Sequence, residues 1–336
     1  MDSLTQIALG AAVGVAVMRR RTAVWKAALW GAIGGTLPDL DVFIDHGDPI
    51  LNMVLHRAQS HALFWLTLFS LPFTAIVVWL HREAQQWRRW WLALWLVLIT
   101  HPLLDALTVY GTQLALPFSS HPFAVGSVFI IDPLVTLPWL AGPIWALAAR
   151  GSARSLRAND VTLLLGCAYL ALGLVAQQQV RATALSSLQQ QGVRAERVLV
   201  TPAAFSVLLW RVVAIDGGRY LEGYRSLLDA PGPMHFDRFD RGAALDADLA
   251  AHPGAARIRA FSHGFYKFDE VGTLVRISDL RMGAEPNYSF SFAIARRASA
   301  VQALPTTRSM GSRIDLQRAL PWFWRRLRGE ALPPPR

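Results

Sequence analysis

The stretch Ala62–Leu80, ALFWLTLFSLPFTAIVVWL, decides the fold of this chain. It contains no charged residue and has nearly the ~20 apolar residues that a helix needs to cross a bilayer. It therefore predicts a membrane-spanning helix. The composition agrees, because 53% of the 336 residues are hydrophobic, only 17% are charged, and 13 tryptophans suit anchoring at the level of the lipid headgroups.

Apolar stretches on both sides of this segment predict the rest of a membrane bundle. They are Leu4–Val17, Ala23–Leu37, Trp90–Val109, Val128–Ala149 and Val161–Ala176. The first two are shorter than a span usually is, so they could be tilted spans or a helical hairpin buried in the bundle. Residues 1–177 are thus expected to form an α-helical integral membrane bundle with about five or six membrane helices.

The character of the chain changes after Gln177, where alternating and β-branched segments replace the long apolar runs. The turn signal Asp216-Gly217-Gly218 separates two such segments and predicts a hairpin. The expected strands are Phe205–Ile215, Arg219–Leu227, Ile258–Phe268, Thr273–Ile277 and Tyr288–Ala295, with a helix at Ala243–Ala251. Residues 178–336 are therefore expected to form a soluble, mainly antiparallel β (α+β) domain.

Three short basic segments predict the orientation in the membrane. Arg19–Arg21, His81–Arg89 and Arg150–Arg157 flank the apolar stretches, and the positive-inside rule places all three in the cytoplasm. The alternation of spans then puts everything after Gln177 on the external side. The net charge of +10 is read as part of this topology signal, and no clustered basic motif predicts nucleic-acid binding.

Side chains of the metal-ligand type stand in short polar islands among the apolar stretches. The predicted ligands are Asp39, Asp41, His56, His61, His101 and Asp105. Ionisable residues at membrane depth are costly and usually mark a site, and the orientation above gathers these on one face. A mixed nitrogen and oxygen set suits zinc, manganese or iron(II) better than calcium.

Each pair in this set leaves an alternative open. His101 and Asp105 stand four apart in a helix, so both can reach a common ion or form a hydrogen-bonded structural lock. Asp39 and Asp41 follow Pro38 in a turn, where simple solvation is the alternative.

The histidines of the second island, His56 and His61, are five residues apart. They would diverge on an ideal helix unless the chain bends between them. Arg57 could hold a phosphate or carboxylate, or neutralise Asp39 or Asp41. Asp132, before Pro133, could be a ligand, orient a ligand or cap a helix.

The order and spacing of the islands resemble one family, the membrane-bound metal-dependent hydrolases, also described as LexA-binding, YdjM-like inner-membrane proteins. The resemblance rests on Met1–Gln6, Gly35–Asp41, His56-Arg57 with Ser60-His61, Thr100–Asp105, Tyr110–Thr112, Ile131–Pro133, Leu209–Arg211, Ser262–Tyr266 and Asp279–Gly283. It covers nearly the whole chain and departs from the pattern at Gln6, where many relatives have histidine. It implies an integral protein of the bacterial inner membrane with a metal site and presumed hydrolase activity. Together with the orientation above, the expectation is a multi-pass protein whose C-terminal domain is periplasmic. The LexA partner is cytoplasmic, and nothing in these residues supports it.

The resulting hypothesis is a metal-dependent hydrolase that uses a divalent metal, with zinc the first choice and manganese or iron open. Asp132 would orient a histidine or act as general base, Arg57 would clamp a phosphate, and Tyr110 would donate to developing charge. A site at headgroup depth favours a lipid-linked or phosphoester substrate. The alternative is a non-enzymatic membrane protein with a structural metal or ion-binding site and an outer domain that binds a partner.

Overall fold

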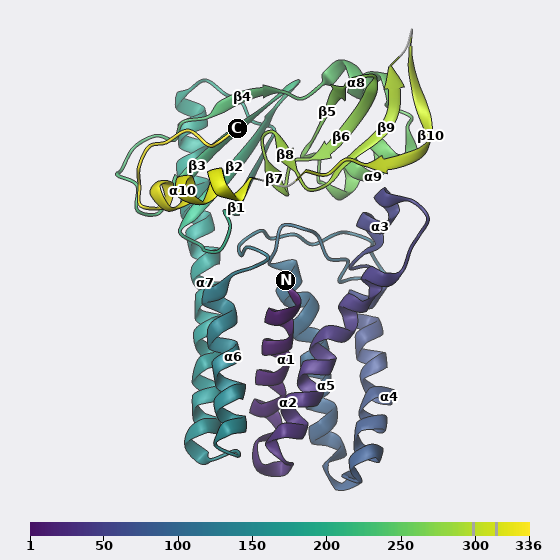
Figure 1. Cartoon of the computed structure of the whole chain (residues 1–336), viewed down its shortest axis with the longest axis vertical. Coiled ribbons are helices and arrows are strands. Elements are labelled where there is room, and N and C mark those ends of the chain that lie inside the picture. The colour runs from purple at the N-terminus through teal and green to yellow at the C-terminus, as the bar shows by residue number, and fades with distance from the viewer. Residues whose placement is uncertain (298–299, 313–314) are drawn as a thin grey trace. The chain divides into compact units, whose positions relative to one another are not determined.

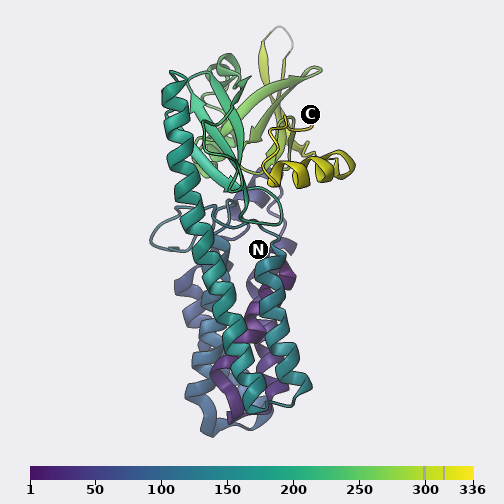
Figure 2. The same cartoon turned by 90° about the vertical axis from the view of Figure 1, so that its left-hand side faces the viewer.

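The structure is a computed structural model that describes residues 1–297, 300–312 and 315–336. The chain forms two compact units. The first comprises Met1–Ile44, Leu55–Leu174 and Ala204–Ser206, and the second comprises Asp45–Val54, Val175–Ala203 and Val207–Arg336. Helix α7, Ala153–Gln190, is continuous and contributes to both (Figure 2).

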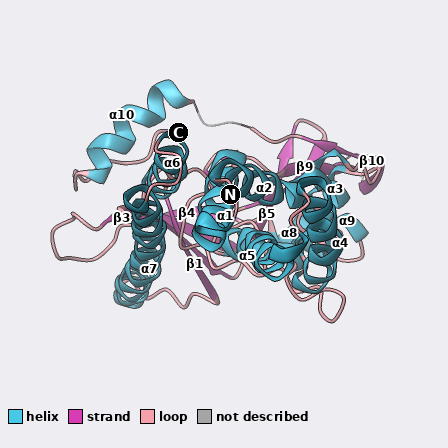
Figure 3. Cartoon of the chain, turned by 90° about the horizontal axis from the view of Figure 1, so that it is seen from below, coloured by secondary structure: helices cyan, strands magenta, loops and turns pink. Residues whose placement is uncertain are grey.

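The first unit is a helical bundle. Its helices are α1 (Ser3–Met18), α2 (Val24–Thr36), α4 (Leu63–His81), α5 (Trp87–Ala106), α6 (Pro133–Ala148) and the first part of α7. Helix α1 packs against α2, α5 and α6, and most of its side chains are buried (Figure 3). This packing favours an interior position for α1, one of the two alternatives that the short first stretch left open.

Glycines allow α1 and α2 to pack with their backbones in contact. A Cβ atom on Gly31 would lie only 2.2 Å from the carbonyl oxygen of Gly10, and one on Gly35 would lie 2.4 Å from the carbonyl oxygen of Gln6. Small residues at such spacing let helices approach closely without a side chain between them. This contact fixes the end of α2, from which a short 3-10 segment, Leu37–Phe43, continues.

The expectation of five or six membrane helices is corrected by the structure. Among the described residues, two helices are long and apolar enough to cross a membrane, Leu63–His81 and Ala153–Gln190, and Pro133–Ala148 is a shorter apolar helix. The helices α1 and α2 have 16 and 13 residues, fewer than a span needs. Helix α5 has 20 residues, but two arginines in its first turn and the polar pair in its last turns make it less apolar.

The second unit contains two antiparallel four-stranded sheets (Figure 1). The first has the order β1 (Arg197–Pro202), β2 (Leu209–Asp216), β3 (Arg219–Ser226), β4 (Asp237–Asp240). The second has the order β10 (Val301–Ser309), β9 (Ser291–Arg297), β6 (Leu274–Asp279), β5 (Tyr266–Val271). A two-stranded ribbon is formed by β7 (Gly283–Ala284) and β8 (Asn287–Tyr288). The remaining α-helices are α3 (Pro49–Leu55), α8 (Ala243–Asp248), α9 (Pro253–Phe261) and α10 (Leu316–Leu327). A helical region followed by antiparallel β structure is confirmed.

One expected strand, Ile258–Phe268, is wrong over most of its length. Residues up to Phe261 belong to helix α9, and strand β5 begins at Tyr266. Pro253 occupies the first turn of this helix, where its fixed φ is favourable, and the side chain of His252 caps it. Ile258 and Phe261 are three apart, so both lie on the buried face of the helix.

Candidate metal centre

Four predicted ligands meet at one point of the first unit. They are Asp39, His61, His101 and Asp105 (the ligand cluster). Asp39 lies in the 3-10 segment that follows α2, and His61 ends a second 3-10 segment, Gln59–His61, just before α4. His101 and Asp105 project from the same face of α5, one turn apart. Three separate regions of the sequence therefore supply the cluster.

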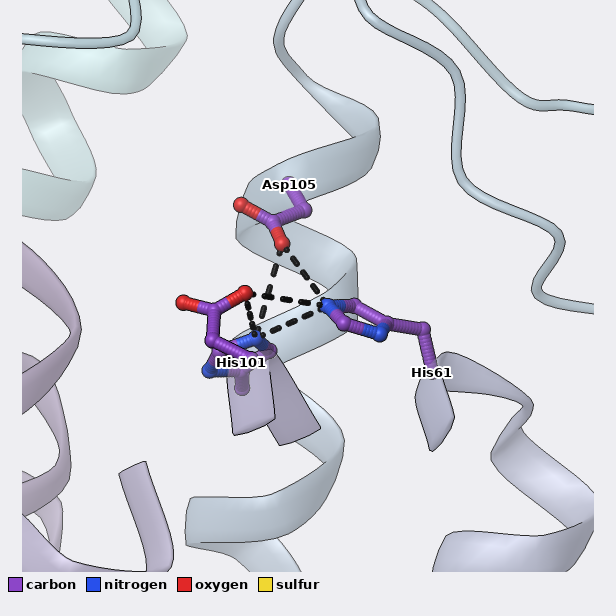
Figure 4. Close-up of side chains that lie close together, drawn as sticks. His61, His101 and Asp105 are labelled. Atoms are coloured by element: carbon purple, nitrogen blue, oxygen red, sulfur yellow. Dashed lines mark hydrogen bonds and ion pairs between the residues drawn. The ribbon is translucent and has the colours of Figure 1, made fainter. Parts of the chain in front are cut away.

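The ligand atoms are spaced as around a single metal ion. The Nε2 atoms of His61 and His101 are 3.1 Å apart, and Asp39 Oδ1 lies 3.4 Å from each of them. Asp105 Oδ2 lies 3.2 Å from His61 Nε2 and 3.5 Å from His101 Nε2 (Figure 4). Zinc bonds of ~2.0–2.1 Å give a tetrahedron with edges of roughly 3.3–3.4 Å. The measured separations scatter around that value, so the residues fit a metal of this size.

Unsatisfied acceptors point to the same position. Within the described part of the chain, Asp39 Oδ1 and Asp105 Oδ2 are buried and accept no hydrogen bond. A buried carboxylate oxygen without a donor is expensive, and a cation between the four atoms would satisfy both oxygens. The side chains of His61, His101 and Asp105 are 0% exposed and that of Asp39 is 18% exposed, so only Asp39 lies on the solvent side.

Both cluster histidines are held in the orientation that a metal requires. His101 Nδ1 lies 2.7 Å from the carbonyl oxygen of Gly35, to which it can only donate, so its Nε2 carries the lone pair when the ring is neutral. His61 Nδ1 lies 2.9 Å from Ser60 Oγ, which donates to Asp41 Oδ2 at 2.5 Å. Such partners fix the tautomer of ligating histidines and are typical of metal centres.

Two predicted ligands, Asp41 and His56, lie beside the ligand cluster. His56 Nδ1 is 2.8 Å from Asp41 Oδ1, while Asp41 Oδ2 accepts from the backbone N–H of Arg57 and from Ser60. Asp41 thus orders the loop that carries His61. The N-cap residue of α4 is Ala62, and the nearby Ser60 hydroxyl donates to Asp41 instead of capping the helix.

Arg57 lies directly against the ligand cluster. Its side chain is buried, its Nε is 3.3 Å from Asp105 Oδ2, and its Nε makes no hydrogen bond within the described residues. The guanidinium lies 5.0 Å from the ring centroid of Tyr110, which also packs edge-on against His56. The backbone of Arg57 has φ of 63°, a left-handed conformation that is unfavourable for residues other than glycine. A buried cation with an unused donor is thus held beside the metal position.

Asp132, the predicted orienting residue or base, takes the role of a helix cap. Its Oδ1 accepts from the backbone N–H of Leu134 at the start of α6, and its Oδ2 accepts from the Tyr169 hydroxyl at 2.9 Å. Burial raises the pKa of Asp132 to about 6, although both hydrogen bonds act in the opposite direction. Its hydrogen bonds are therefore made away from the ligand cluster.

Sequence reasoning missed the contacts that hold the second oxygen of Asp105. Asp105 Oδ1 accepts from the amino group of Met1 and from Gln6 Nε2, the latter at 3.2 Å. Gln6 also donates to the carbonyl oxygen of His101 at 3.2 Å. The signal was the departure at Gln6 from the histidine that the family resemblance implies at this position.

The charges of the metal-free cluster stabilise each other. Burial alone would raise the pKa of Asp39, but the His101 and His61 imidazoles outweigh it and hold that pKa far below its usual range. Burial alone would lower the pKa of His61, but the carboxylates of Asp105 and Asp39 outweigh it and raise that pKa. Without a metal, the site therefore favours a proton on His61 between two carboxylates.

Comparisons with known proteins identify the family of this chain. Residues 1–180, more than half of the chain, match the family described as YdjM inner membrane protein. The chain belongs to this family. A curated relative, the uncharacterized protein YfhP of Bacillus subtilis (strain 168), is 24% identical over 306 residues, covering 86% of this chain and 89% of the relative. No solved structure matches the chain significantly.

The YdjM-family match contains every predicted site residue, from Asp39 to Asp132, and ends within α7. The family description assigns the protein to the inner membrane, in keeping with the two helices that are long and apolar enough to cross it. The matched part is thus the helical region that carries the ligand cluster, whereas the β sheets lie outside it.

Proposed function

We propose that this YdjM-family protein is a membrane-bound metal-dependent hydrolase with its centre at the ligand cluster. The observation that carries the proposal is the convergence of two imidazole nitrogens and two unsatisfied carboxylate oxygens, with separations of 3.1–3.5 Å where they are in contact, on one position. Two nitrogen and two oxygen donors suit zinc, with manganese or iron(II) as further candidates. Such a metal, when bound, supplies Lewis acidity and an acidified water.

The side chains of the site have distinct roles in this proposal. His61, His101 and Asp105 form the fixed, fully buried part of the cluster, while Asp39 is its partly exposed member. Arg57 contributes a guanidinium fork with an unused Nε donor, which suits the paired oxygens of a phosphate or carboxylate group. Tyr110 lies against Arg57 and His56 and positions both. Asp132 is left out of this chemistry because both its oxygens are used near the start of α6.

The substrate class follows from charge and depth. Arg57 favours an anionic group, and a cluster formed where α2 ends and α4 begins favours a substrate at headgroup depth. We therefore assign a phosphoester or lipid-linked substrate. The positive-inside rule, applied to the basic turns, supports a periplasmic location for the cluster and the C-terminal domain.

The test begins with the metal and then asks for turnover. Elemental analysis of the purified, detergent-solubilised protein should find a divalent transition metal bound in a fixed ratio to the chain. The same preparation is then assayed on phosphomonoesters, phosphodiesters and lipid phosphates, with and without chelator. Chelator-sensitive hydrolysis of one class supports the proposal. If the metal-loaded protein hydrolyses none of the three classes, phosphoester hydrolysis is ruled out as its activity.

A structural metal centre is the second candidate, favoured by the number of ligands. Structural zinc sites use four protein ligands, whereas catalytic sites use three and keep one position open. Substitution of Asp39, the partly exposed ligand, distinguishes a catalytic from a structural metal centre. If the centre is catalytic, Asp39→Ala should keep the metal on the three buried ligands, whereas His61→Ala should lose it. Equal loss of metal from both variants favours the structural role and a non-enzymatic protein.

A further inference from the structure

A second site with its own chemistry lies in the first unit, where α1 ends and α2, α5 and α7 begin. A cavity of about 410 Å³ is lined by Arg19–Arg21 from the turn after α1, Arg89 from α5 and Arg157 from α7. Three apolar side chains, Val17, Met18 and Leu156, complete most of its lining. Five guanidinium groups from three parts of the chain therefore share one apolar-based cavity.

The positive charge around this cavity is largely uncompensated. Residues 1–174 contain eleven lysines and arginines, and all but Arg57 lie in the turns and helix ends on this side of the bundle, where Glu83 and Asp160 are the acidic residues. Glu83 accepts from Lys26 at 2.6 Å, and Asp160 is paired with Arg19.

Four of the five lining arginines are left without such a partner. In the part of the chain that the structure describes, Arg20 donates to the carbonyl oxygen of Gly151, and neither it nor Arg21, Arg89 or Arg157 forms an ion pair with a carboxylate. Like charges repel at this separation, so an anion in the cavity would relieve a cost that the protein otherwise carries. The geometry therefore calls for a negatively charged ligand.

We propose that this cavity binds the phosphate-bearing headgroup of an anionic phospholipid. Arginine forks match phosphate oxygens in pairs, and basic pockets between membrane helices are suited to such headgroups. The volume falls in the ~300–1,000 Å³ range of small-molecule sites. Inorganic phosphate would leave the partly exposed Val17 and the exposed Ala153 of the lining uncovered, whereas the glycerol and first acyl carbons of a lipid would cover them. A membrane helix bundle meets such lipids continuously.

The positive-inside rule alone would also place arginines in these turns. The test must therefore distinguish arginines that line the cavity from arginines that merely lie on the same side of the bundle. The pocket variant is Arg89→Gln with Arg157→Gln. The matched control is Arg82→Gln with Arg154→Gln, which removes the same charge from the adjoining turns but does not touch the lining. Both pairs are exposed, so both variants should fold.

Binding is measured on the full chain in neutral detergent with dihexanoyl phosphatidylglycerol below its micellar concentration. Dihexanoyl phosphatidylcholine and inorganic phosphate are the comparison ligands. We expect saturable phosphatidylglycerol binding that weakens at least about 10-fold in the pocket variant, since hydrogen bonds to charged groups are lost, and is unchanged in the control. Equal weakening in both variants would reduce the effect to general charge and overturn the proposal. Equal binding of phosphatidylcholine or inorganic phosphate would overturn the assignment to an anionic lipid.

Discussion

The Nε2 atoms of His61 and His101 lie 3.1 Å apart although 40 residues separate them in the chain. The Nδ1 atom of His101 donates to the Gly35 carbonyl, and that of His61 faces a serine hydroxyl already committed to Asp41. Two neutral rings in this arrangement would point lone pairs at each other. A shared cation or proton must therefore occupy the space between them, and the competition between metal and proton leads to the first predictions.

Removal of either α5 ligand should release the metal. We expect His101→Ala and Asp105→Ala each to reduce bound metal by at least ~10-fold, the loss found even for residues that only orient ligands. Both variants should still insert into the membrane. The measurement is metal per chain in purified protein, with His46→Ala, an exposed histidine outside the cluster, as control. Full metal content in both variants would make the pair a structural lock.

Metal affinity should increase with pH. Because the pKa of His61 is raised in the metal-free site by the carboxylates of Asp105 and Asp39, a proton must leave His61 before the metal binds at any pH below that raised pKa. Affinity is then weak below that pKa and grows by up to ~10-fold per pH unit as pH rises toward it. Titration of chelator-stripped protein with zinc at pH 6, 7 and 8 measures the slope. His46→Ala should behave as the parent protein, and a flat profile would contradict the assigned proton.

The shape of the Arg57 side chain should matter more than its charge. Arg57→Lys keeps a cation but replaces the fork with a point charge, so metal content should stay constant while turnover falls. The assay uses whichever substrate class the hydrolysis screen identifies. Arg82→Lys, in an exposed turn, is the control. Unchanged turnover in Arg57→Lys would limit this residue to neutralising Asp105.

The glycine contact between α1 and α2 should control the metal site from within the bundle. In Gly31→Ala the new Cβ would meet the Gly10 carbonyl, which overpacking data equate with ~1–3 kcal/mol of destabilisation. Separation of the helices would also move Gly35, so metal binding should weaken together with thermal stability. Leu29→Ala, an exposed position on the same helix, should change neither. Retention of both properties in Gly31→Ala would refute this coupling.

The orientation can be tested with reporter fusions. A reporter inserted at Gln86, in the turn before α5, should be active only as a cytoplasmic fusion, because that turn is basic. A reporter fused after Arg336 should be active only as a periplasmic fusion. A cytoplasmic signal from the terminal fusion would contradict the placement of the C-terminal domain.

Local pattern was sufficient for parts of the bundle and of the site. The uncharged run before Leu80 predicted α4, and the four-residue spacing of His101 and Asp105 predicted that they share one face of α5. The turn at Asp216–Gly218 predicted the β2–β3 hairpin, which the register of Ile215 opposite Tyr220 confirms. In each case the determining interactions lie within a few residues.

Long-range packing decided what the sequence could not predict. His56 and His61 look equivalent as ligands, but the left-handed turn at Arg57 directs one ring to Asp41 and the other to the cluster. Gln6 reaches Asp105 because α1 packs against α5, 99 residues away in the chain. The apolar stretches also overestimated the number of membrane-spanning helices, because α1 and α2 have only 16 and 13 residues.

The backbone of Arg57 is strained, yet its side chain supports the fold. Its left-handed conformation, kept by Asp41 at the N–H and by the N–H of Gln113 at the carbonyl, costs of the order of 1–3 kcal/mol in a residue with a side chain. Arg57→Gly would relieve that strain, but it would also take the guanidinium away from the buried Asp105 carboxylate and leave a cavity. Loss of one partner of a buried ion pair costs ~3–5 kcal/mol, which exceeds the strain. Selection for heat resistance alone would therefore keep Arg57, even in a protein from which activity is never demanded.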